Sequence, residues 1–400
     1  MKILLISQYF YPENFKINDL IFSLKKRGHQ ITVLTGKPNY SKTHFFDGYG
    51  WKSDDFETIN EIPVYRANLF SRRNGGVFRL FLNYISFAFL ATLKIRKIKG
   101  SFDAIFVYQT SPVTVGIPAI FAKICLNTPI FFWVQDLWPA SLAAAGGIKN
   151  KFILGFFDLL TKWIYNHSKK ILIQSNGFRE YILNQGIPNE KIIFYPNPTE
   201  DFYKPLNNVK EYQEFFQNEF FNIVFAGNIG EAQSFKTIIK AINNIKDLPV
   251  NIIVLGDGRY KDTALSLIKE KGLESHFNFL GSFPPTEMPK FFFHADALLV
   301  SLKKNKIFSL TIPAKIQSYL ACGKPIIASI NGEGAKIVND ANCGVTSPAE
   351  DSLTLSMKIK ELMDLDKYKR NEMGNNGRAY YEKEFDRNNL LEKLEGIFKS

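Results

Sequence analysis

The sequence predicts an α/β protein made of two doubly wound domains, and three observations lead to this prediction. The chain has 400 residues, which is long for one domain, and 46% of them are hydrophobic, enough for two sizeable cores. Short apolar runs alternate with helical patterns along the chain, as in parallel sheets with crossover helices. A stretch with prolines, asparagines and charges, 199–218, interrupts this alternation and marks the expected domain boundary.

Charge and cysteine content narrow the class of partner and the compartment. The 50 Lys and Arg residues exceed the 38 Asp and Glu residues, and the net charge of +12 indicates a polyanionic partner. Nucleic acid, a phosphorylated substrate and an anionic membrane surface all fit this charge. The cysteines Cys125, Cys322 and Cys343 lack metal-ligand spacing and are expected to be reduced thiols in a reducing cytosol.

The first domain is expected to open with a βαβ unit. The apolar run at the start of the chain is too short for a secretory signal and lacks a small-residue cleavage site, so it predicts the first strand. A helix follows to Arg27, and the second strand covers 30–35. The segment 37–70 is expected to be an irregular excursion with strand signals near 59–66.

The segment 71–99 has the most unusual composition in the chain. Its uncharged core, 80–93, is apolar and aromatic but shorter than the about 20 apolar residues that a membrane span needs. It predicts an interfacial helix whose flanking cations meet anionic lipid. The alternative is a helix buried in the first domain. The cations on its two sides are Arg72, Arg73, Arg79, Lys94, Arg96, Lys97 and Lys99.

The following strands are expected to bring polar groups to the carboxyl edge of the first sheet. Strands over 102–108 and 129–134 lead to Asp136, and further strands are predicted over 170–174 and 191–195. Reactive groups of α/β domains lie at this edge, which makes Asp136 a candidate reactive group. The alternative role for this carboxylate is to cap the next helix.

The second domain repeats the alternation of strands and helices. Its first two strands end in glycine turns, Gly227 to Gly230 and Gly256 to Gly258. The short Gly-x-Gly pattern is a weak signal for a nucleotide, because the rest of the dinucleotide fingerprint is missing. The predicted elements are strands over 221–226, 250–255 and 278–280 and helices from Ser234 and Pro285.

One stretch of the second domain, 297–329, predicts an anion site. It has the pattern strand, basic loop, helix, strand, with the helix opening near Thr311 as N-cap, Pro313 in its first turn and Gly323 at its end. A helix N-terminus at the carboxyl edge of a parallel sheet offers free N–H groups and a positive dipole to an anion. The alternative is an empty junction beside a solvated loop. The lysines around this helix start are Lys303, Lys304, Lys306 and Lys315.

Several motifs of this stretch resemble the nucleotide-sugar-binding segment of family 4 retaining glycosyltransferases. They are Pro313-x-Lys315, the run from Tyr319 through Ala321 to Gly323, and the Lys-Pro-Ile-Ile that follows. The run from Asp136 to Pro139 resembles a loop of bacterial polysaccharide glycosyltransferases.

This resemblance implies the GT-B fold and a division of labour between its domains. An acceptor-binding domain would cover 1–198 and be joined by the C-terminal helix in 380–400, while a nucleotide-sugar-binding domain would cover 199–379. The implied reaction transfers a sugar from a nucleoside diphosphate with retention of configuration.

The resemblance also assigns roles to residues. Asp136 would orient the acceptor hydroxyl or act as a base, and Lys315 would stabilise the charge on the leaving diphosphate. Glu13 and Asn14, in a loop where the family usually has glycines, would lie on the acceptor side. The expected donor-binding residues are Gly227, Asn228, Gly256, Gly258, Lys303, Thr311, Gln317, Ser318 and Glu333.

Two features of the family are missing. Its paired glutamates align with Leu310 and Ser318, and the arginine and lysine that grip the diphosphate align with Asn228 and Gln233. Neutralisation of the diphosphate is therefore expected to depend on the lysines near the central helix and on backbone amides.

Within the family, the resemblance is greatest to transferases of fucosyl or N-acetylfucosaminyl residues that build O-antigen, capsule or colanic-acid-like polysaccharides. It implies a nucleotide-sugar donor such as a UDP-sugar, an undecaprenyl-diphosphate-linked sugar acceptor and no nucleic acid partner. It also implies a location in the cytoplasm, at the inner face of the bacterial cytoplasmic membrane, with contact through 71–99.

Neither a metal nor another cofactor is expected, because the five histidines are scattered without ligand spacing. Two rival interpretations remain. A nucleotide-sugar epimerase or hydrolase would use the same fold, and a basic non-catalytic module that binds a membrane or nucleic acid would explain the charge.

Overall fold

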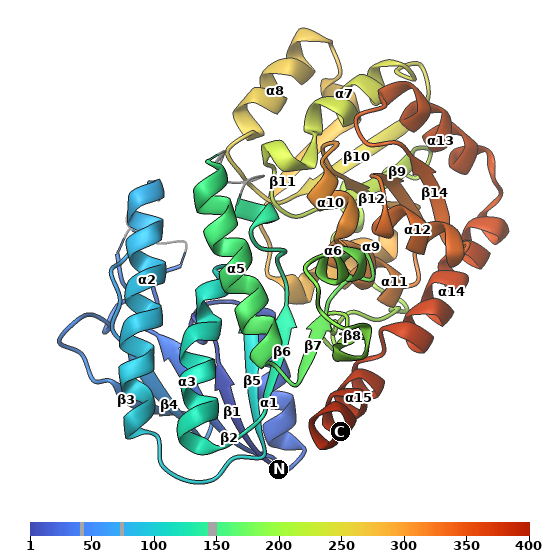
Figure 1. The fold of residues 1–400 in the computed structure, drawn as a ribbon. Helices are drawn as coiled ribbons and strands as arrows, with labels where there is room; N and C mark the ends of the chain where they lie inside the picture. The colour runs from blue at the N-terminus through green and yellow to red at the C-terminus, as the bar shows by residue number, and fades with distance from the viewer. Residues whose placement is uncertain (41–43, 73–75, 143–149) are drawn as a thin grey trace. The chain divides into compact units, whose positions relative to one another are not determined.

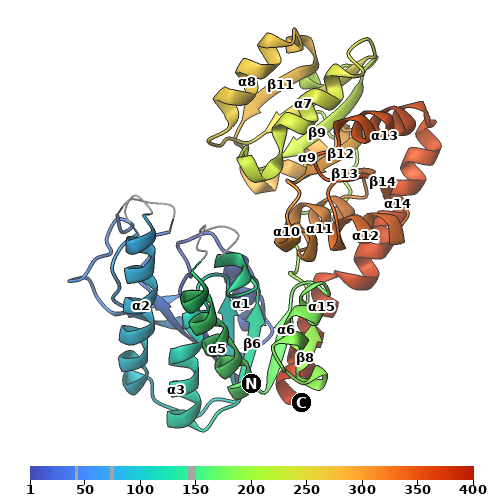
Figure 2. The same ribbon diagram turned by 45° about the horizontal axis from the view of Figure 1, so that its top comes forward.

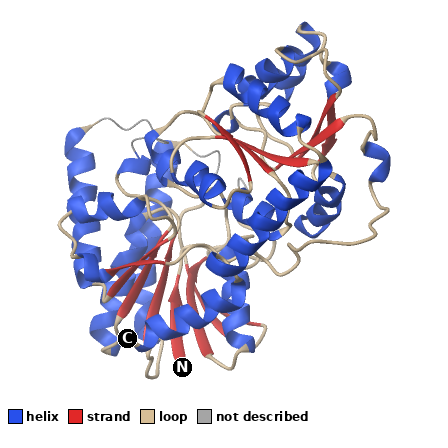
Figure 3. Ribbon diagram, turned by 90° about the vertical axis from the view of Figure 1, so that its right-hand side faces the viewer, coloured by secondary structure: helices blue, strands red, loops and turns tan. Residues whose placement is uncertain are grey.

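The computed structural model of the chain describes residues 1–40, 44–72, 76–142 and 150–400, which form two compact units (Figure 1). The first unit comprises Met1–Pro196 and Leu390–Ser400, and the second comprises Asn197–Asn389. Each unit contains one sheet of mainly parallel strands with helices around it (Figure 3). The predicted class, two doubly wound α/β domains, is thereby confirmed.

The first unit is built on an eight-stranded sheet in the order β3-β4-β2-β1-β5-β6-β7-β8. Neighbouring strands are parallel except for the β3–β4 hairpin at one edge. The inner strands are continuous apolar runs because helices cover both faces of the sheet. The strands are β1 (Lys2–Ile6), β2 (Gln30–Gly36), β3 (Phe56–Ile59), β4 (Ile62–Ala67), β5 (Ala104–Gln109), β6 (Ile130–Val134), β7 (Lys170–Ile173) and β8 (Ile192–Phe194).

Two groups of helices cover this sheet. The helices α2, α3 and α5 lie side by side on one face (Figure 2), whereas α1 and the C-terminal α15 pack into the core on the other face. Phe398 of α15 contacts the rings of Phe106 and Phe131 in the sheet. The helices are α1 (Lys16–Lys26), α2 (Val77–Lys94), α3 (Gly116–Leu126), α5 (Lys151–His167), α6 (Phe178–Asn184) and α15 (Arg387–Lys399).

The second unit is built on a six-stranded, wholly parallel sheet in the order β11-β10-β9-β12-β13-β14. The strands are β9 (Phe221–Ala226), β10 (Val250–Leu255), β11 (Phe277–Gly281), β12 (Ala297–Ser301), β13 (Ile326–Ser329) and β14 (Gly344–Ser347). The helices are α7 (Phe235–Asn243), α8 (Lys261–Glu270), α9 (Met288–His294), α10 (Lys306–Leu310), α11 (Ala314–Ala321), α12 (Glu333–Asp340), α13 (Ser352–Asp364) and α14 (Lys367–Glu384).

Two parts of the fold differ from the sequence-based expectation. Residues 380–389 belong to the second unit, because α14 packs along α11 and its Arg378 donates a hydrogen bond to the carbonyl of Ala321 at 2.7 Å. The segment 37–70, expected to be irregular apart from strand signals near 59–66, contains β4 at that signal and also β3, which pairs with it in a hairpin. Its turn residues Asn60 and Glu61 both have positive φ, 47° and 61°, the geometry of the tight turns that join twisted strands.

Candidate active site

Lys315 occupies the first turn of α11, and its amine is removed from water. The Nζ atom lies 3.8 Å from the centroid of the Phe225 ring at the end of β9. Nζ is buried and has no hydrogen-bond partner among the described residues. Burial lowers the pKa of Lys315 from 10.5 to about 7. An unpartnered amine of this kind is a binding group for an anion, because a phosphate would supply both the charge and the acceptor that it lacks.

The turns after β9 and β10 cross next to this amine. Gly227, with φ of 131°, passes so close to Lys315 that a Cβ atom would lie 2.7 Å from its Cε. Gly256, with φ of 141°, would place a Cβ atom 2.0 Å from the carbonyl oxygen of Gly227. Backbone hydrogen bonds from Gly227 to Leu255 (2.7 Å) and from Ile229 to Asp257 (2.8 Å) hold the crossing. The crossing therefore requires glycine at both positions.

Asn228 and Gln233 occupy the positions where the family has its arginine and lysine, and they contact each other. Asn228 Nδ2 donates to Gln233 Oε1 at 3.3 Å, and the backbone N–H of Gly230 donates to the same oxygen at 3.1 Å. Gly258 lies beside Asn228 in the neighbouring turn. The two amides thus order the loop after β9 without adding a charge to the neighbourhood of Lys315.

The predicted helix start at Thr311 is wrong. Asn305 caps a separate short helix, α10, by accepting hydrogen bonds from the N–H groups of Ile307 (2.8 Å) and Phe308 (3.4 Å). Thr311 follows α10 and donates its hydroxyl to the carbonyl of Ile307 at 3.0 Å. The second helix, α11, starts after Pro313, which is its N-cap with extended geometry (ψ of 129°). The proline also disfavours helical geometry in Ile312, the residue before it.

The other predicted donor residues of this stretch have mixed environments. Lys303 is not a free cation, since its Nζ lies 3.3 Å from Glu231 Oε2. Ser318 Oγ donates to the carbonyl of Ala314 at 3.3 Å. Gln317 is 1% exposed, and neither atom of its amide has a hydrogen-bond partner among the described residues. Glu333 begins α12 and is half-buried.

The start of α12 lies against the start of α11. Gly334, next to Glu333, packs against Pro313 and Ile316. The structure thus brings Lys315, Gly227, Gly256, Asn228 and Gly258 into one cluster, with Glu333 beside the same helix start. This cluster lies at the carboxyl edge of the second sheet, where α/β domains bind ligands.

In the first unit, Asp136 follows β6 at the carboxyl edge of the sheet. Its backbone carbonyl accepts a hydrogen bond from Gln109 Nε2 at 3.1 Å, but no described residue donates to its carboxylate. Burial raises the pKa of Asp136 from 3.8 to about 7. A carboxylate with this pKa can accept a proton near neutral pH.

Glu13 has a structural contact that the sequence did not reveal. Its Oε1 accepts hydrogen bonds from the N–H groups of Asn39 (2.8 Å) and Tyr40 (2.6 Å), which holds the loop after β2. Burial raises the pKa of Glu13 to about 7 although these two bonds act in the opposite direction. Asn14 is exposed to solvent.

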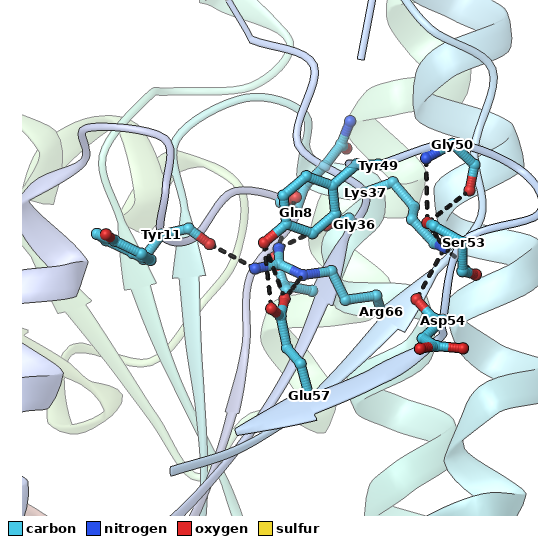
Figure 4. Close-up of polar contacts among 11 residues, drawn as sticks. Gln8, Tyr11, Gly36, Lys37, Tyr49, Gly50, Ser53, Asp54, Glu57 and Arg66 are labelled. Atoms are coloured by element: carbon cyan, nitrogen blue, oxygen red, sulfur yellow. Dashed lines mark hydrogen bonds and ion pairs between the residues drawn. The ribbon is translucent and has the colours of Figure 1, made fainter. Parts of the chain in front are cut away.

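Sequence reasoning missed a buried polar network at the same edge of the first sheet (Figure 4). Arg66 is 1% exposed, pairs with Glu57, and donates to the carbonyls of Gly36 (3.1 Å) and Tyr11 (2.5 Å). Lys37, also 1% exposed, has its own set of acceptors. They are the carbonyl of Ser53 (2.7 Å), the hydroxyl of Ser53 (2.5 Å) and the carbonyl of Asp54 (2.9 Å). The available signal was a basic residue at or just beyond the end of an apolar strand.

Arg72 was expected to be one of the cations that flank the helix in 71–99 and contact lipid, but it contacts tyrosines instead. Its guanidinium sits over the rings of three tyrosines, with its central carbon 4.7 Å from the centroid of Tyr40, and donates to the hydroxyls of Tyr9 (2.7 Å) and Tyr84 (2.9 Å). The tyrosine rings stabilise this cation, which is partly buried. Arg73 lies outside the described residues.

No group of three or more His, Cys, Asp or Glu residues that could hold a metal ion occurs in the described part of the chain. The absence of a metal requirement stays a prediction.

Comparison with known proteins finds one family model that matches the first unit and another that matches the second. Residues 16–198 match the family model "Glycosyl transferase 4-like domain", and residues 208–380 match "Glycosyl transferases group 1". The fold and these matches define the chain as a GT-B glycosyltransferase. It belongs to the group 1 glycosyltransferases that have a family-4-like N-terminal domain.

Individual relatives are distant. The chain is 23% identical over 341 residues to the "Putative colanic acid biosynthesis glycosyl transferase WcaI" of Escherichia coli (strain K12), covering 81% of this chain and 82% of that protein. The crystal structure of Anabaena Alr3699/HepE in complex with UDP has a TM-score of 0.74 and 14% identity, with full coverage of both chains. Sucrose-phosphate synthase from Thermosynechococcus elongatus has a TM-score of 0.77 and 14% identity, with 100% of this chain and 98% of that chain covered.

Proposed function

We propose that this glycosyltransferase transfers a sugar from a nucleoside diphosphate sugar to a hydroxyl of a lipid-linked oligosaccharide during synthesis of a bacterial surface polysaccharide. The observation that carries the proposal is Lys315, whose buried amine has no partner among the described residues and lies at the start of α11. The colanic acid relative supports the polysaccharide, and the UDP complex of the structural neighbour supports UDP as the nucleotide.

In the proposed reaction the bond between the sugar and the donor diphosphate breaks, and the acceptor oxygen bonds to the same carbon. Negative charge then grows on the leaving diphosphate. Lys315 and the free N–H groups at the start of α11 stabilise that charge more strongly than the charge of the intact donor. Configuration is retained, and no covalent enzyme intermediate is formed.

Asp136 is proposed to orient the acceptor hydroxyl, while a donor phosphate oxygen or this carboxylate accepts the hydroxyl proton. Its pKa of about 7 keeps a useful share of the carboxylate ionised near neutral pH. The proposed mechanism uses no metal ion, because the amine of Lys315 and the helix amides neutralise the leaving group.

The finer assignment concerns the sugar, the acceptor and the location. We propose N-acetyl-L-fucosamine or a related deoxysugar as the transferred group and an undecaprenyl-diphosphate-linked sugar as the acceptor. The protein would work at the inner face of the bacterial cytoplasmic membrane, with contact through 71–99.

A thermal-shift panel with UDP, GDP, ADP and CMP, each with and without EDTA, tests the donor site. We expect UDP to raise the melting temperature of the wild type regardless of EDTA. Lys315→Ala should remove most of this shift and lower turnover more than about tenfold, because the diphosphate loses its cation. The matched control is Lys336→Ala on the exposed side of α12, which should change neither.

The reaction class is tested by incubating the wild type with the donor and no acceptor. Free or epimerised sugar formed at the rate of transfer would favour the hydrolase or epimerase interpretation. Normal turnover of Lys315→Ala would remove the assignment of this site.

A further inference from the structure

The outer side of α2 is apolar, although a surface helix normally carries polar residues there. Phe78, Phe81, Ile85, Phe89 and Leu93 recur every three or four residues and are 39% to 70% exposed. The opposite side of α2 packs into the first unit. By length and composition the helix Phe78–Lys97 could span a membrane, but it contacts β2, β4 and α3 and is therefore a layer of the fold.

A second apolar stripe lies on α5. Asn150 caps this helix by accepting hydrogen bonds from the N–H groups of its first turn, and Phe152 in that turn is 90% exposed. Phe156, Leu159 and Trp163 continue the stripe at helical spacing with 61%, 69% and 42% exposure. The inner side of α5 is filled by buried residues, so this stripe is additional to what the core needs.

The two stripes belong to one continuous face. The helix α3 lies between α2 and α5 and contacts both (Figure 2), and its Ile124 is 72% exposed. All three helices cover the same side of the first sheet, so their outer sides point the same way. An exposed apolar face of this extent marks a contact with a partner or a membrane.

The charges around this face select the partner. The three helices contain a single acidic residue, Asp158, which accepts a hydrogen bond from Gln185 at 2.8 Å. The exposed cations at the helix ends and sides include Arg96, Lys99, Lys151 and Lys162, while the exposed Lys97 pairs with Asp55. A second copy of the chain would bring cations against cations, whereas an anionic bilayer offers both opposite charge and an apolar interior.

We infer that α2, α3 and α5 together form a docking face for an anionic lipid bilayer. The apolar stripes enter the boundary between headgroups and acyl chains, and the cations contact lipid phosphates. This inference rests on the proposed lipid-linked acceptor and extends the contact from 71–99 to α3 and α5.

The direction of the helices gives the face a relation to the candidate site in the same unit. Both α2 and α5 run antiparallel to the strands that flank them in the chain, so Phe78 and Phe152 lie near the carboxyl edge of the sheet. Asp136 lies at this edge too. An acceptor anchored in the bound bilayer would therefore arrive on the side of the unit that carries Asp136.

Flotation with lipid vesicles tests the inference, and α5 is the element to change because 71–99 remains intact. Wild type should float with vesicles of phosphatidylcholine and phosphatidylglycerol. The triple variant Phe152→Ser, Phe156→Ser and Leu159→Ser should lose more than about 100-fold in partitioning. Its fold should persist, as checked by circular dichroism, because the three side chains are exposed.

Two further variants control the result. Leu353→Ser with Met357→Ser removes two side chains of 62% exposure from α13 in the second unit and should leave flotation unchanged. Lys151→Glu with Lys162→Glu should weaken binding to vesicles that contain phosphatidylglycerol while sparing the weaker binding to pure phosphatidylcholine.

Flotation of the triple variant equal to that of the wild type would overturn the inference. So would a wild type that ignores vesicles and forms a dimer in sedimentation velocity, since the face would then serve self-association. Turnover on the proposed lipid-linked acceptor in detergent micelles, where no bilayer is needed, is measured in parallel. If that turnover is absent while flotation behaves as expected, the proposed function fails and the docking face stands.

Discussion

Each unit holds a lysine near the carboxyl edge of its sheet whose amine is removed from water, and the two differ in what they contact. Lys37 in the first unit donates three hydrogen bonds, whereas Lys315 in the second donates none to the described residues. Burial lowers the pKa of both amines. The desolvation of Lys37 is offset within the fold, while that of Lys315 is left for a ligand to offset.

The two buried carboxylates of the first unit repeat this contrast. Burial raises the pKa of Glu13 and of Asp136 to about 7. Glu13 accepts two backbone hydrogen bonds, and the carboxylate of Asp136 accepts none from the described residues. In this molecule, buried ionisable groups that have hydrogen-bond partners are therefore expected to stabilise the fold. Those without partners among the described residues are expected to bind ligands or to act in catalysis.

The largest expected effect is on stability and concerns Arg66, a buried cation with partners in the fold. Arg66→Ala should lower the free energy of unfolding by about 3–5 kcal/mol, because it leaves Glu57 without its cation and the carbonyls of Gly36 and Tyr11 without their donor. Urea denaturation measures this change. The control is Lys25→Ala, which breaks only the exposed pair with Glu61 and should cost less than about 1 kcal/mol. Equal stability of the two variants would contradict the architectural role of Arg66.

Asp136→Asn should act on chemistry alone. We expect turnover to fall by about 100-fold with little change in stability, because the amide keeps the shape but cannot accept a proton. In the wild type, turnover should rise with pH through about 7 as the carboxylate ionises. The inflection should be missing from the residual activity of the variant. Glu13→Gln is the matched control and should keep the pH inflection. If the inflection disappears in Glu13→Gln instead, Glu13 is the proton-accepting carboxylate and Asp136 the structural one.

A smaller effect on stability should distinguish the two lysines, Lys37 and Lys315. Lys37→Met should lower stability by about 1–3 kcal/mol, because it leaves buried oxygens without a donor. Lys315→Met keeps the volume and loses no hydrogen bond in the described structure, so stability should stay the same or rise. Thermal and urea unfolding of the two variants measure the difference. A loss of stability in Lys315→Met as large as in Lys37→Met would remove the contrast.

The last effect is on the pH dependence of stability, where the change is gradual, at most about 1.4 kcal/mol per pH unit. The unfolded chain binds a proton at Lys315 up to about pH 10.5, whereas the folded protein releases it near pH 7. Stability of the wild type should therefore rise with pH between these values by up to about 1.4 kcal/mol per unit, relative to Lys315→Met. UDP binding should weaken over the same range, because the bound diphosphate favours the protonated amine. Parallel pH curves for the two proteins would contradict the pKa shift.

How much of the site could be predicted depends on how far apart its partners are in the chain. Lys315 was found because its helix start is a local pattern with a proline two residues before it. Lys303 and Glu231 are 72 residues apart, and Arg72 and Tyr9 are 63 apart, so neither pairing has a local signal. The start of α11 was predicted too early in the chain, because the preceding segment forms a separate helix, α10, that Asn305 caps.

The sequence by itself determined the two doubly wound domains, because strand and helix periodicity and proline positions act within a few residues. It also determined that cations gather near the start of α11 and around α2. Only the tertiary structure decided which of them are paired. Lys315 has no hydrogen-bond partner in the described part of the chain, Lys303 pairs with Glu231, and the apolar stripe on α5 lies on the same face as that on α2. The order of strands in each sheet sets which distant segments meet in this way.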